Sequence, residues 1–599
     1  MGTKTGFKIP TRLDAIWFWL RVWGLVLLRV VRDLHTPGLR RHARSPRLAR
    51  APVIAESRTP LWDDGRTDEF ALLAGKVHNL RLAAKAFDRV HVPAHGLLSF
   101  WRQLGRTSRW HGYVEGREIR EGCVVPTVAG GLCQLSNALA SCALRAGMTL
   151  VERHAHSARI EDAARNRPGP GDATVFWNYL DLRLRAEFAF QLDVALTATE
   201  LVVRIRAETA LAVPDRFPRV MLLRRSPPDR TPKPVARGCL TCNETACFRY
   251  RPDAASATGR TAILVNAWTP EFARYLEPHA RDADWCIPWV RAARRGAGAW
   301  QTMQMASVRI ARMGSMRRMA WLRWHAVRNE GGRRQAAVMQ ADHWLARAYA
   351  RALRPEHSHL VIDQSLLVPL RRLGVLGGRR YDVLLQALPA TEIQRRLDLA
   401  RQRWPQADSL TDFRIDDAYC HEELRALEAA HCAITPHAEV ARYVRSFVGL
   451  KDVRQLAWAS PPAAPRIERA HPAGVPTVVF PASALARKGV LDLAHALRIL
   501  GWKLTVLGSP AEDPRIWDGV FVSYSSYRDP RWLQAADVVA LPAYIEHSPR
   551  ALLRAREAGI PVVATPACGL PASDGLQLVP PGDVVALLTA LRRAAPGNE

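Results

Sequence analysis

The chain has 599 residues, which is too many for one hydrophobic core and predicts three or four folding units. Apolar residues make up 48% and charged residues 24%, so the composition excludes a disordered or low-complexity protein. The 85 lysines and arginines outnumber the 56 acidic residues, giving a net charge of +29 that favours phosphorylated substrates or anionic lipid surfaces. A general use of arginine as a solubilising residue would produce the same excess. No nucleic-acid-binding pattern accompanies it, so nucleic acid is not an expected partner.

The N-terminal segment is apolar but repeatedly interrupted by charge. Arg21, Arg29 and Arg32 divide residues 16–32 into uncharged runs far shorter than the roughly 20 residues that cross a bilayer. No small-residue cleavage site follows, so neither a transmembrane helix nor a cleaved signal peptide is predicted. Tryptophans beside arginines suit a helix lying in a membrane interface, although a helix packed on the protein's own body is the alternative.

The ten cysteines show no regular framework of spacings. A secreted scaffold stabilised by disulfides is therefore not expected, and a reducing compartment fits better. Together with the basic N-terminal helix, this predicts a cytoplasmic protein, peripheral on the inner face of the membrane.

The first folding unit follows a linker. Residues 1–60 combine the amphipathic helix with a segment rich in proline and arginine. Residues 61–210 alternate helical and strand patterns and end in polar–apolar alternation at 190–208, which is typical of a sheet. An α+β domain is therefore predicted over 61–210. Residues 211–260, rich in proline, arginine and cysteine, are interpreted as a connector.

A cysteine at a predicted helix N-terminus is the main candidate for chemistry in this unit. Apolar spacing predicts a helix whose first turn contains Cys133, where the positive end of the helix dipole favours a thiolate. Residues 148–157 are predicted as a strand that places His154 and His156 on one face, and Asp172 could orient one of them. Thiol-based acyl transfer would use such a set. The alternative is a cysteine acting as a small buried hydrophobe beside solvated histidines.

Several segments of this unit resemble the VanW family in order and spacing. The family's central motif falls on Gly130, Gly131, Cys133 and Gln134, and its histidine motif on residues 152–156. The resemblance implies that these residues form a site, with an envelope polymer or a peptide as substrate, but it implies no particular reaction. The family is linked by name to glycopeptide resistance. The matching segments are 75–84, 92–105, 130–139, 151–157 and 171–185.

The connector carries a possible metal site, formed by Cys239, Cys242 and Cys247. Two cysteines separated by two residues can coordinate one metal ion, so zinc or an iron–sulfur cluster is a candidate cofactor. Cys286 or a histidine could supply the fourth ligand. Structural cysteines without a metal are the alternative.

From residue 356 onward, short apolar strands alternate with amphipathic helices, which indicates parallel sheets built from βαβ units. A proline-rich stretch at 460–476 divides this region in two. The predicted architecture is therefore α/β multidomain, with two Rossmann-like lobes at 261–455 and 474–599 joined by a linker at 456–473.

Residues 474–594 resemble the nucleotide-sugar-binding lobe of retaining GT-B glycosyltransferases of group 1. The resemblance implies that Arg487, Lys488, Gly489 and Gly508 bind the nucleotide-sugar donor, with Lys488 neutralising its diphosphate. It places Glu546 at the first position of the family's paired-glutamate motif, with a catalytic or donor-binding role. Upstream, residues 360–370, 411–417 and 426–444 match the companion lobe by pattern alone.

Two positions depart from the family. Arg554 stands where the second glutamate holds the donor ribose, and Ser483 stands where an arginine is usual. Arg487 or Arg550 could take over the neutralisation of phosphate, or the site could be altered.

The leading hypothesis is a VanW-domain glycosyltransferase that moves a sugar from a nucleotide-diphosphate donor to an envelope or lipid-linked acceptor at the cytoplasmic membrane face. One alternative is a thiol-dependent enzyme using Cys133, with a degenerate transferase module. The other is a non-catalytic scaffold.

Overall fold

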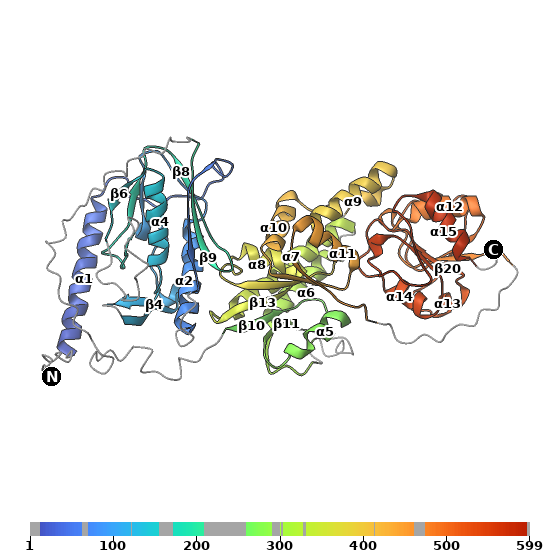
Figure 1. Ribbon diagram of the computed structural model, residues 1–599, viewed down its shortest axis with the longest axis horizontal. Helices are drawn as coiled ribbons and strands as arrows, with labels where there is room; N and C mark the ends of the chain where they lie inside the picture. Colours follow the sequence, from blue (N-terminus) through green and yellow to red (C-terminus); the bar gives the residue numbers. More distant parts are fainter. Residues whose placement is uncertain are drawn as a thin grey trace. The chain divides into compact units, whose positions relative to one another are not determined.

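The protein is described by a computed structural model (Figure 1). The described residues are 12–62, 70–120, 123–154, 172–208, 259–289, 300, 303–326, 331–412, 414–459 and 474–595. They form two compact units, each taken by itself below. The first unit contains residues up to 260 with 354–358 and 374–380, and the second contains 261–353, 359–373 and 381–599.

Antiparallel sheets form the first unit, as the alternation at 190–208 predicts. A four-stranded sheet has the order β1-β9-β8-β2, and smaller sheets pair β3-β7-β6 and β4-β5. Helices α2 and α4 pack on these strands and bury leucines such as Leu80, Leu135 and Leu139. The elements are β1 (Val53–Pro60), α2 (Phe70–Phe87), β2 (Val90–Val92), β3 (Leu97–Ser99), α3 (Phe100–Leu104), β4 (Glu115–Arg120), β5 (Cys123–Val128), α4 (Cys133–Arg145), β6 (Thr149–Glu152), β7 (Arg183–Arg185), β8 (Phe190–Leu196) and β9 (Glu200–Arg206).

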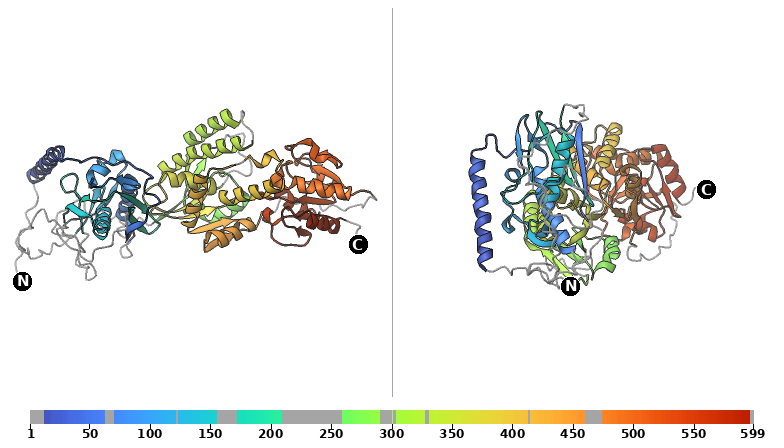
Figure 2. Two further views of the ribbon diagram at one scale, coloured as in Figure 1. Left: turned by 90° about the horizontal axis from the view of Figure 1, so that it is seen from above. Right: turned by 60° about the vertical axis from the view of Figure 1, so that its left-hand side comes forward.

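Helix α1 (Arg12–Leu34) is part of this unit (Figure 2), and one of its charged residues is buried against it. Arg29 is 5% exposed, and its guanidinium donates to both carboxylate oxygens of Glu152 at 2.8 Å and to Asp181 at 3.1 Å. Arg183 joins the network by pairing with Asp33 and Asp181. The docking is therefore a buried ion network.

Apolar side chains of α1 lie in solvent. Leu20, Leu27, Leu28 and Val31 are each at least 48% exposed, although burying them would be favourable. Among the described residues, no helix combines the length and the apolar character needed to span a bilayer.

The first lobe of the second unit is built on a seven-stranded sheet with the order β12-β11-β10-β13-β14-β15-β16. The strand pairs β10–β11, β11–β12, β14–β15 and β15–β16 are parallel. The edge strand β12 precedes the two long helices α6 and α7. The elements are β10 (Arg260–Leu264), α5 (Pro270–Leu276), β11 (Asp284–Pro288), β12 (Ser307–Ala311), α6 (Arg312–Ala326), α7 (Gly331–Ala352), β13 (His357–Asp363), α8 (Gln364–Arg372), β14 (Arg380–Leu384), α9 (Ala390–Arg403), α10 (Asp417–Glu428), β15 (Cys432–Thr435), α11 (Ala438–Tyr443) and β16 (Asp452–Gln455).

The second lobe is a six-stranded parallel sheet with the order β19-β18-β17-β20-β21-β22. Its central strands are continuous apolar runs, as expected for strands covered on both faces. The elements are β17 (Thr477–Phe480), the short 3-10 helix η10 (Ala486–Lys488), α12 (Val490–Leu500), β18 (Lys503–Val506), β19 (Phe521–Tyr524), α13 (Arg531–Ala535), β20 (Val538–Leu541), α14 (Arg550–Glu557), β21 (Val562–Ala564), β22 (Leu576–Leu578) and α15 (Val584–Ala594).

Both sheets have the strand order of a dinucleotide-binding fold. Counted from the first strand of each lobe, the order is 3-2-1-4-5-6, with β16 added at the edge of the first sheet. The direction of winding reverses between strands 1 and 4, and ligands of such folds bind beyond the carboxyl ends of those strands. The predicted pair of Rossmann-like lobes is confirmed. In the second lobe, a ligand is therefore expected at the loops after β17 and β20.

Candidate functional site

The loops after β17 and β20 are joined by backbone hydrogen bonds. Tyr544 and Ile545 donate their N–H groups to the carbonyl of Arg487 at 3.1 and 3.2 Å. Gly489 ends η10 with φ of +78°, and a Cβ there would lie 2.0 Å from the carbonyl oxygen of Pro542. Glycine is required on both counts, because the conformation is left-handed and the other loop passes directly beside it. The sequence-predicted Lys488 and Glu546 are thus held on adjoining loops.

Lys488 and Glu546 form a buried ion pair. The Nζ of Lys488 lies 2.8 Å from Oε2 of Glu546, and their side chains are 13% and 11% exposed. The other oxygen, Oε1, accepts the backbone N–H groups of His547 and Ser548 at 2.9 and 2.8 Å. Burial alone would raise the pKa of Glu546, but the Lys488 charge and these hydrogen bonds hold it below its ordinary value. Burial lowers the pKa of Lys488.

His437 fixes the Glu546 loop from the first lobe. Its Nδ1 accepts the N–H of Val440 at 3.3 Å and caps α11, so Nε2 carries the proton and donates to the Glu546 carbonyl at 2.8 Å. Burial lowers the pKa of His437, which favours this neutral form. The residue is fully buried and acts as a positioning residue.

The candidates for replacing the family's arginine have different surroundings. Arg550 donates to both oxygens of Glu271 at 2.6 and 2.7 Å and lies over the ring of Trp458 at 5.2 Å. Glu271 is 2% exposed, so the Arg550 guanidinium already neutralises a buried carboxylate. Arg487 instead lines a pocket beside the Lys488–Glu546 pair.

The two family departures make local contacts. The Ser483 hydroxyl lies 3.4 Å from the Ser509 hydroxyl. The Ser483 backbone passes so close to Gly508 that a Cβ there would lie 2.4 Å from its nitrogen. The Arg554 guanidinium lies over the ring of Tyr527 at 5.7 Å. Gly508 therefore shapes the loop, and Arg554 is on α14 as the motif requires.

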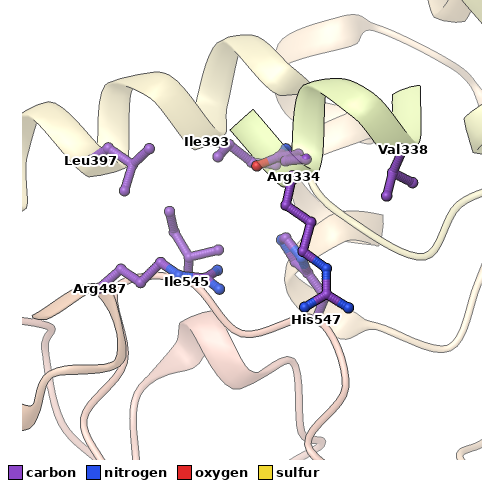
Figure 3. Close-up of a pocket in the computed structure, with 8 residues that line it drawn as sticks. Arg334, Val338, Ile393, Leu397, Arg487, Ile545 and His547 are labelled. Carbon is purple, nitrogen blue, oxygen red and sulfur yellow. The ribbon is translucent and has the colours of Figure 1, made fainter. Parts of the chain in front are cut away.

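The pocket beside the ion pair has a volume of about 370 Å³ and is lined from both lobes (Figure 3). Four apolar side chains and four polar ones line it, and no acidic residue is among the described residues that do. The lining residues are Arg334, Gln335 and Val338 of α7, Ile393 and Leu397 of α9, and Arg487, Ile545 and His547 of the second lobe. Arg334 and His547 were not predicted from the sequence, because Arg334 lies outside the motifs and His547 is at an unspecified position inside the paired-glutamate motif.

The first lobe has a polar cluster at its own switch point, and its residues were not predicted from the sequence either. Asn266, which follows β10, donates to Asp342 at 3.1 Å and to Ser365 at 2.9 Å. Asp363, at the end of β13, accepts the N–H of Ser365 at 3.0 Å. Burial raises the pKa of Asp363 to about 6. An Asn or Asp directly after a central strand is the pattern that could have revealed it.

In the first unit, α4 begins at Cys133 as the spacing predicts. The Cys133 thiol is half-buried and lies 3.6 Å from the Thr174 hydroxyl and 3.8 Å from the Val175 carbonyl oxygen. The Thr174 N–H donates to the His154 carbonyl at 2.7 Å. Thr174 therefore contacts Cys133 and His154 at once.

The glycine pair before Cys133 is explained by close packing. A Cβ on Gly130 would lie 2.4 Å from the Gly116 carbonyl oxygen, and Gly131 has φ of +96°. The buried Asn79 donates to the carbonyl of Gly130 at 3.0 Å. The motif thus shapes the turn that leads into α4.

The histidine motif is arranged differently from the predicted strand. Strand β6 ends at Glu152, so His154 lies beyond it. The His154 Nε2 is 3.0 Å from Oε1 of Glu152. Burial opposes the charge of Glu152, yet its bonds to His154 and Arg29 lower the carboxyl pKa to about 2. A role for Asp172 stays a proposal, and His156 lies outside the described residues.

Cys239, Cys242 and Cys247 also lie outside the described residues. Cys286, offered as a fourth ligand, is buried in β11, and burial raises the pKa of its thiol to about 12. Within the described ranges, no cluster of three metal-ligating side chains is present.

Comparison with known families supports two separate modules. Residues 75–206 match the family described as VanW like protein, and residues 475–595 match the family described as Glycosyl transferases group 1. The chain therefore contains a VanW-like domain at 75–206 and a group 1 glycosyltransferase domain at 475–595.

Two relatives match the first module. The Uncharacterized protein YoaR of Bacillus subtilis is 33% identical over 111 residues, covering 18% of this chain and 35% of that protein. The Vancomycin B-type resistance protein VanW of Enterococcus faecalis is 27% identical over 159 residues, covering 26% of this chain and 58% of that protein. The chain thus spans less than two thirds of either relative.

Solved structures align with part of the chain at low similarity. Sucrose-phosphate synthase from Thermosynechococcus elongatus is 15% identical with a TM-score of 0.35, covering 56% of this chain and 89% of that one. The UDP-forming α,α-trehalose-phosphate synthase from Burkholderia vietnamiensis is 14% identical with a TM-score of 0.34, covering 56% and 90%.

Proposed function

We propose that the protein is a glycosyltransferase that takes its sugar from a nucleotide-diphosphate donor and transfers it to an envelope or lipid-linked acceptor. The bond from the anomeric carbon to the diphosphate oxygen breaks, and a bond to an acceptor hydroxyl oxygen forms. The hydroxyl proton leaves, and the nucleoside diphosphate is released. The chemistry requires neutralisation of the leaving group's charge, which Lys488 can supply.

The observation that carries this proposal is the meeting of Lys488 and Glu546 at the switch point of a six-stranded parallel sheet. Ligands of such sheets bind at this place, and the loops there are joined tightly enough to fix both side chains. A lysine and a glutamate on adjoining loops offer one group for phosphate and one for sugar hydroxyls. The match of this lobe to group 1 glycosyl transferases supports the same conclusion.

Titration of the full-length protein with UDP and GDP tests the proposal, with uridine and guanosine as controls. We expect one of the two diphosphates to bind at least about tenfold more tightly than its nucleoside, because the basic loop contacts phosphate. The matching nucleotide sugars should then be hydrolysed or transferred. Absence of binding by both diphosphates would refute the donor-site assignment.

The acceptor would be reached at the cytoplasmic face of the membrane. The exposed leucines of α1 offer an apolar surface to the membrane. The segment after the helix, residues 35–52, is basic and contains no acidic residue. An anionic leaflet would attract that segment. Its exposed arginines are Arg40, Arg41, Arg44, Arg47 and Arg50.

A second candidate function centres on Cys133. The observation in its favour is that the thiol lies half-buried at the start of α4, with Thr174 contacting both it and the His154 backbone. In this case the first module would act on an envelope polymer or peptide by thiol chemistry. The connector cysteines would bind zinc or an iron–sulfur cluster in either case, as a separate proposal.

Alkylation of the native protein at neutral pH tests the second candidate. We expect iodoacetamide to label Cys133 at least about tenfold faster than Cys142, because exposure and thiolate character set the rate. Cys142 is fully buried, and burial raises the pKa of its thiol to about 12. Peptide mass spectrometry measures both sites in one sample. Equal labelling of the two cysteines would argue against a reactive thiol.

A further inference from the structure

We propose that Arg334 and Arg487 bind the two phosphates of the donor from opposite lobes, with His547 donating a further hydrogen bond. This inference rests on the proposed glycosyltransferase function and assigns the phosphate subsite within it. It explains how the protein manages without the arginine that Ser483 replaces.

The pocket brings the two arginines together from distant parts of the chain. Arg334 comes from the first turns of α7, and Arg487 from η10, which is 153 positions later in the sequence. Both line the same cavity, and Figure 3 shows Arg334 reaching from α7 toward the loop that carries His547. A ligand in the cavity would therefore contact both lobes.

The charge in this pocket matches a diphosphate. The Glu546 carboxylate is paired with Lys488, and no acidic residue is among the described residues that line the cavity. Two guanidinium groups thus bring two positive charges, and the diphosphate of a nucleotide sugar carries one negative charge on each phosphate. Guanidinium groups bind phosphate oxygens in a two-pronged geometry, which fixes orientation as well as charge.

His547 supplies an independent indication that a polar ligand belongs there. Its Nε2 atom is buried and has no hydrogen-bond partner among the described residues. Buried polar atoms in folded proteins are nearly always hydrogen-bonded, so an unpartnered one in the lining of a cavity indicates that a polar ligand would fit there. Burial lowers the pKa of His547 to about 3, so the ring is neutral and offers one N–H.

The apolar side chains that line the pocket strengthen its interaction with a charged ligand. Val338, Ile393, Leu397 and Ile545 surround the polar groups with apolar surface. An apolar wall displaces water and strengthens each electrostatic contact with the ligand. The volume of about 370 Å³ is within the range of small-molecule sites.

The test is titration of the full-length Arg334→Ala protein with UDP and GDP. We expect affinity for the bound diphosphate to fall at least about tenfold, with Arg334→Lys intermediate, since one charge-assisted contact is removed. His547→Phe should weaken binding by about threefold or more, because the ring loses its N–H. Arg347→Ala is the matched control, because Arg347 is an exposed arginine on the same helix and does not line the pocket.

Other outcomes would overturn the inference. Affinity of Arg334→Ala within twofold of wild type would exclude Arg334 from the phosphate subsite. Glucose 6-phosphate serves as a second probe: if Arg334→Ala weakened its binding and left diphosphate binding unchanged, the pocket would hold a phosphorylated acceptor instead. Failure of the wild-type protein to bind either diphosphate would refute the proposed function itself. That result differs from the one that refutes the phosphate subsite, in which the wild type binds a diphosphate and Arg334→Ala binds it equally well.

Discussion

The Lys488→Ala protein is expected to bind UDP or GDP about a hundredfold more weakly than wild type. The substitution removes the ammonium of a side chain that is 13% exposed and leaves the Glu546 carboxylate without its partner beside the incoming phosphate. Removing one partner of a buried, hydrogen-bonded charge pair costs about 2–5 kcal/mol, and here the diphosphate would also meet an unpaired carboxylate. Isothermal titration measures the effect directly.

Two further variants show whether the loss belongs to this position. Lys503→Ala removes an exposed lysine at the opposite end of a strand in the same sheet, and its affinity should equal that of wild type. Glu546→Gln should retain diphosphate binding and lose sugar transfer, because the lysine remains and the carboxylate does not. Undiminished affinity in Lys488→Ala would remove this residue from the donor site.

Arg29→Ala is expected to release α1 from the first unit. The guanidinium is the shared partner of Glu152, Asp181 and Asp33, and it is 5% exposed. Breaking a buried ion network by deleting one member costs about 3–5 kcal/mol, because the remaining charges stay desolvated without compensation. Hydrogen–deuterium exchange of α1 in the full-length protein measures this locally, since a released helix loses its protection.

Arg32→Ala is the matched control for this experiment. Arg32 lies on the same helix, one turn along, and is exposed. Its substitution should leave the exchange of α1 unchanged. If Arg29→Ala left α1 as well protected as in wild type, the ion network would not be what docks the helix.

Much of the architecture could be predicted from local patterns. The apolar runs that became β13, β14, β15, β17, β18, β20 and β21 lie at the expected places, because buried parallel strands need continuous apolar residues. The spacing after Gly131 placed Cys133 at the start of α4 for a similar reason. Periodicity is a property of neighbouring residues, so the sequence displays it directly.

Contacts between residues far apart in the sequence could not be predicted from such local patterns. Arg29 was treated as an interruption of an apolar stretch, yet it meets Glu152, 123 positions away. Arg334 lies in a basic helical region where its neighbours look equivalent, and only the fold places it in the pocket. Arg550 was a candidate for phosphate until the structure paired it with Glu271, 279 positions away.

That last pair has a consequence for how a substrate could enter. Glu271 is on α5 and Arg550 is on α14, so this two-pronged ion pair beside the Trp458 indole joins the two lobes, as does the hydrogen bond from His437 to the Glu546 carbonyl. Pulling this pair apart would strand a buried carboxylate, so a motion that admits a nucleotide is expected to preserve the contact. A nucleotide would then have to enter without a full separation of the two lobes.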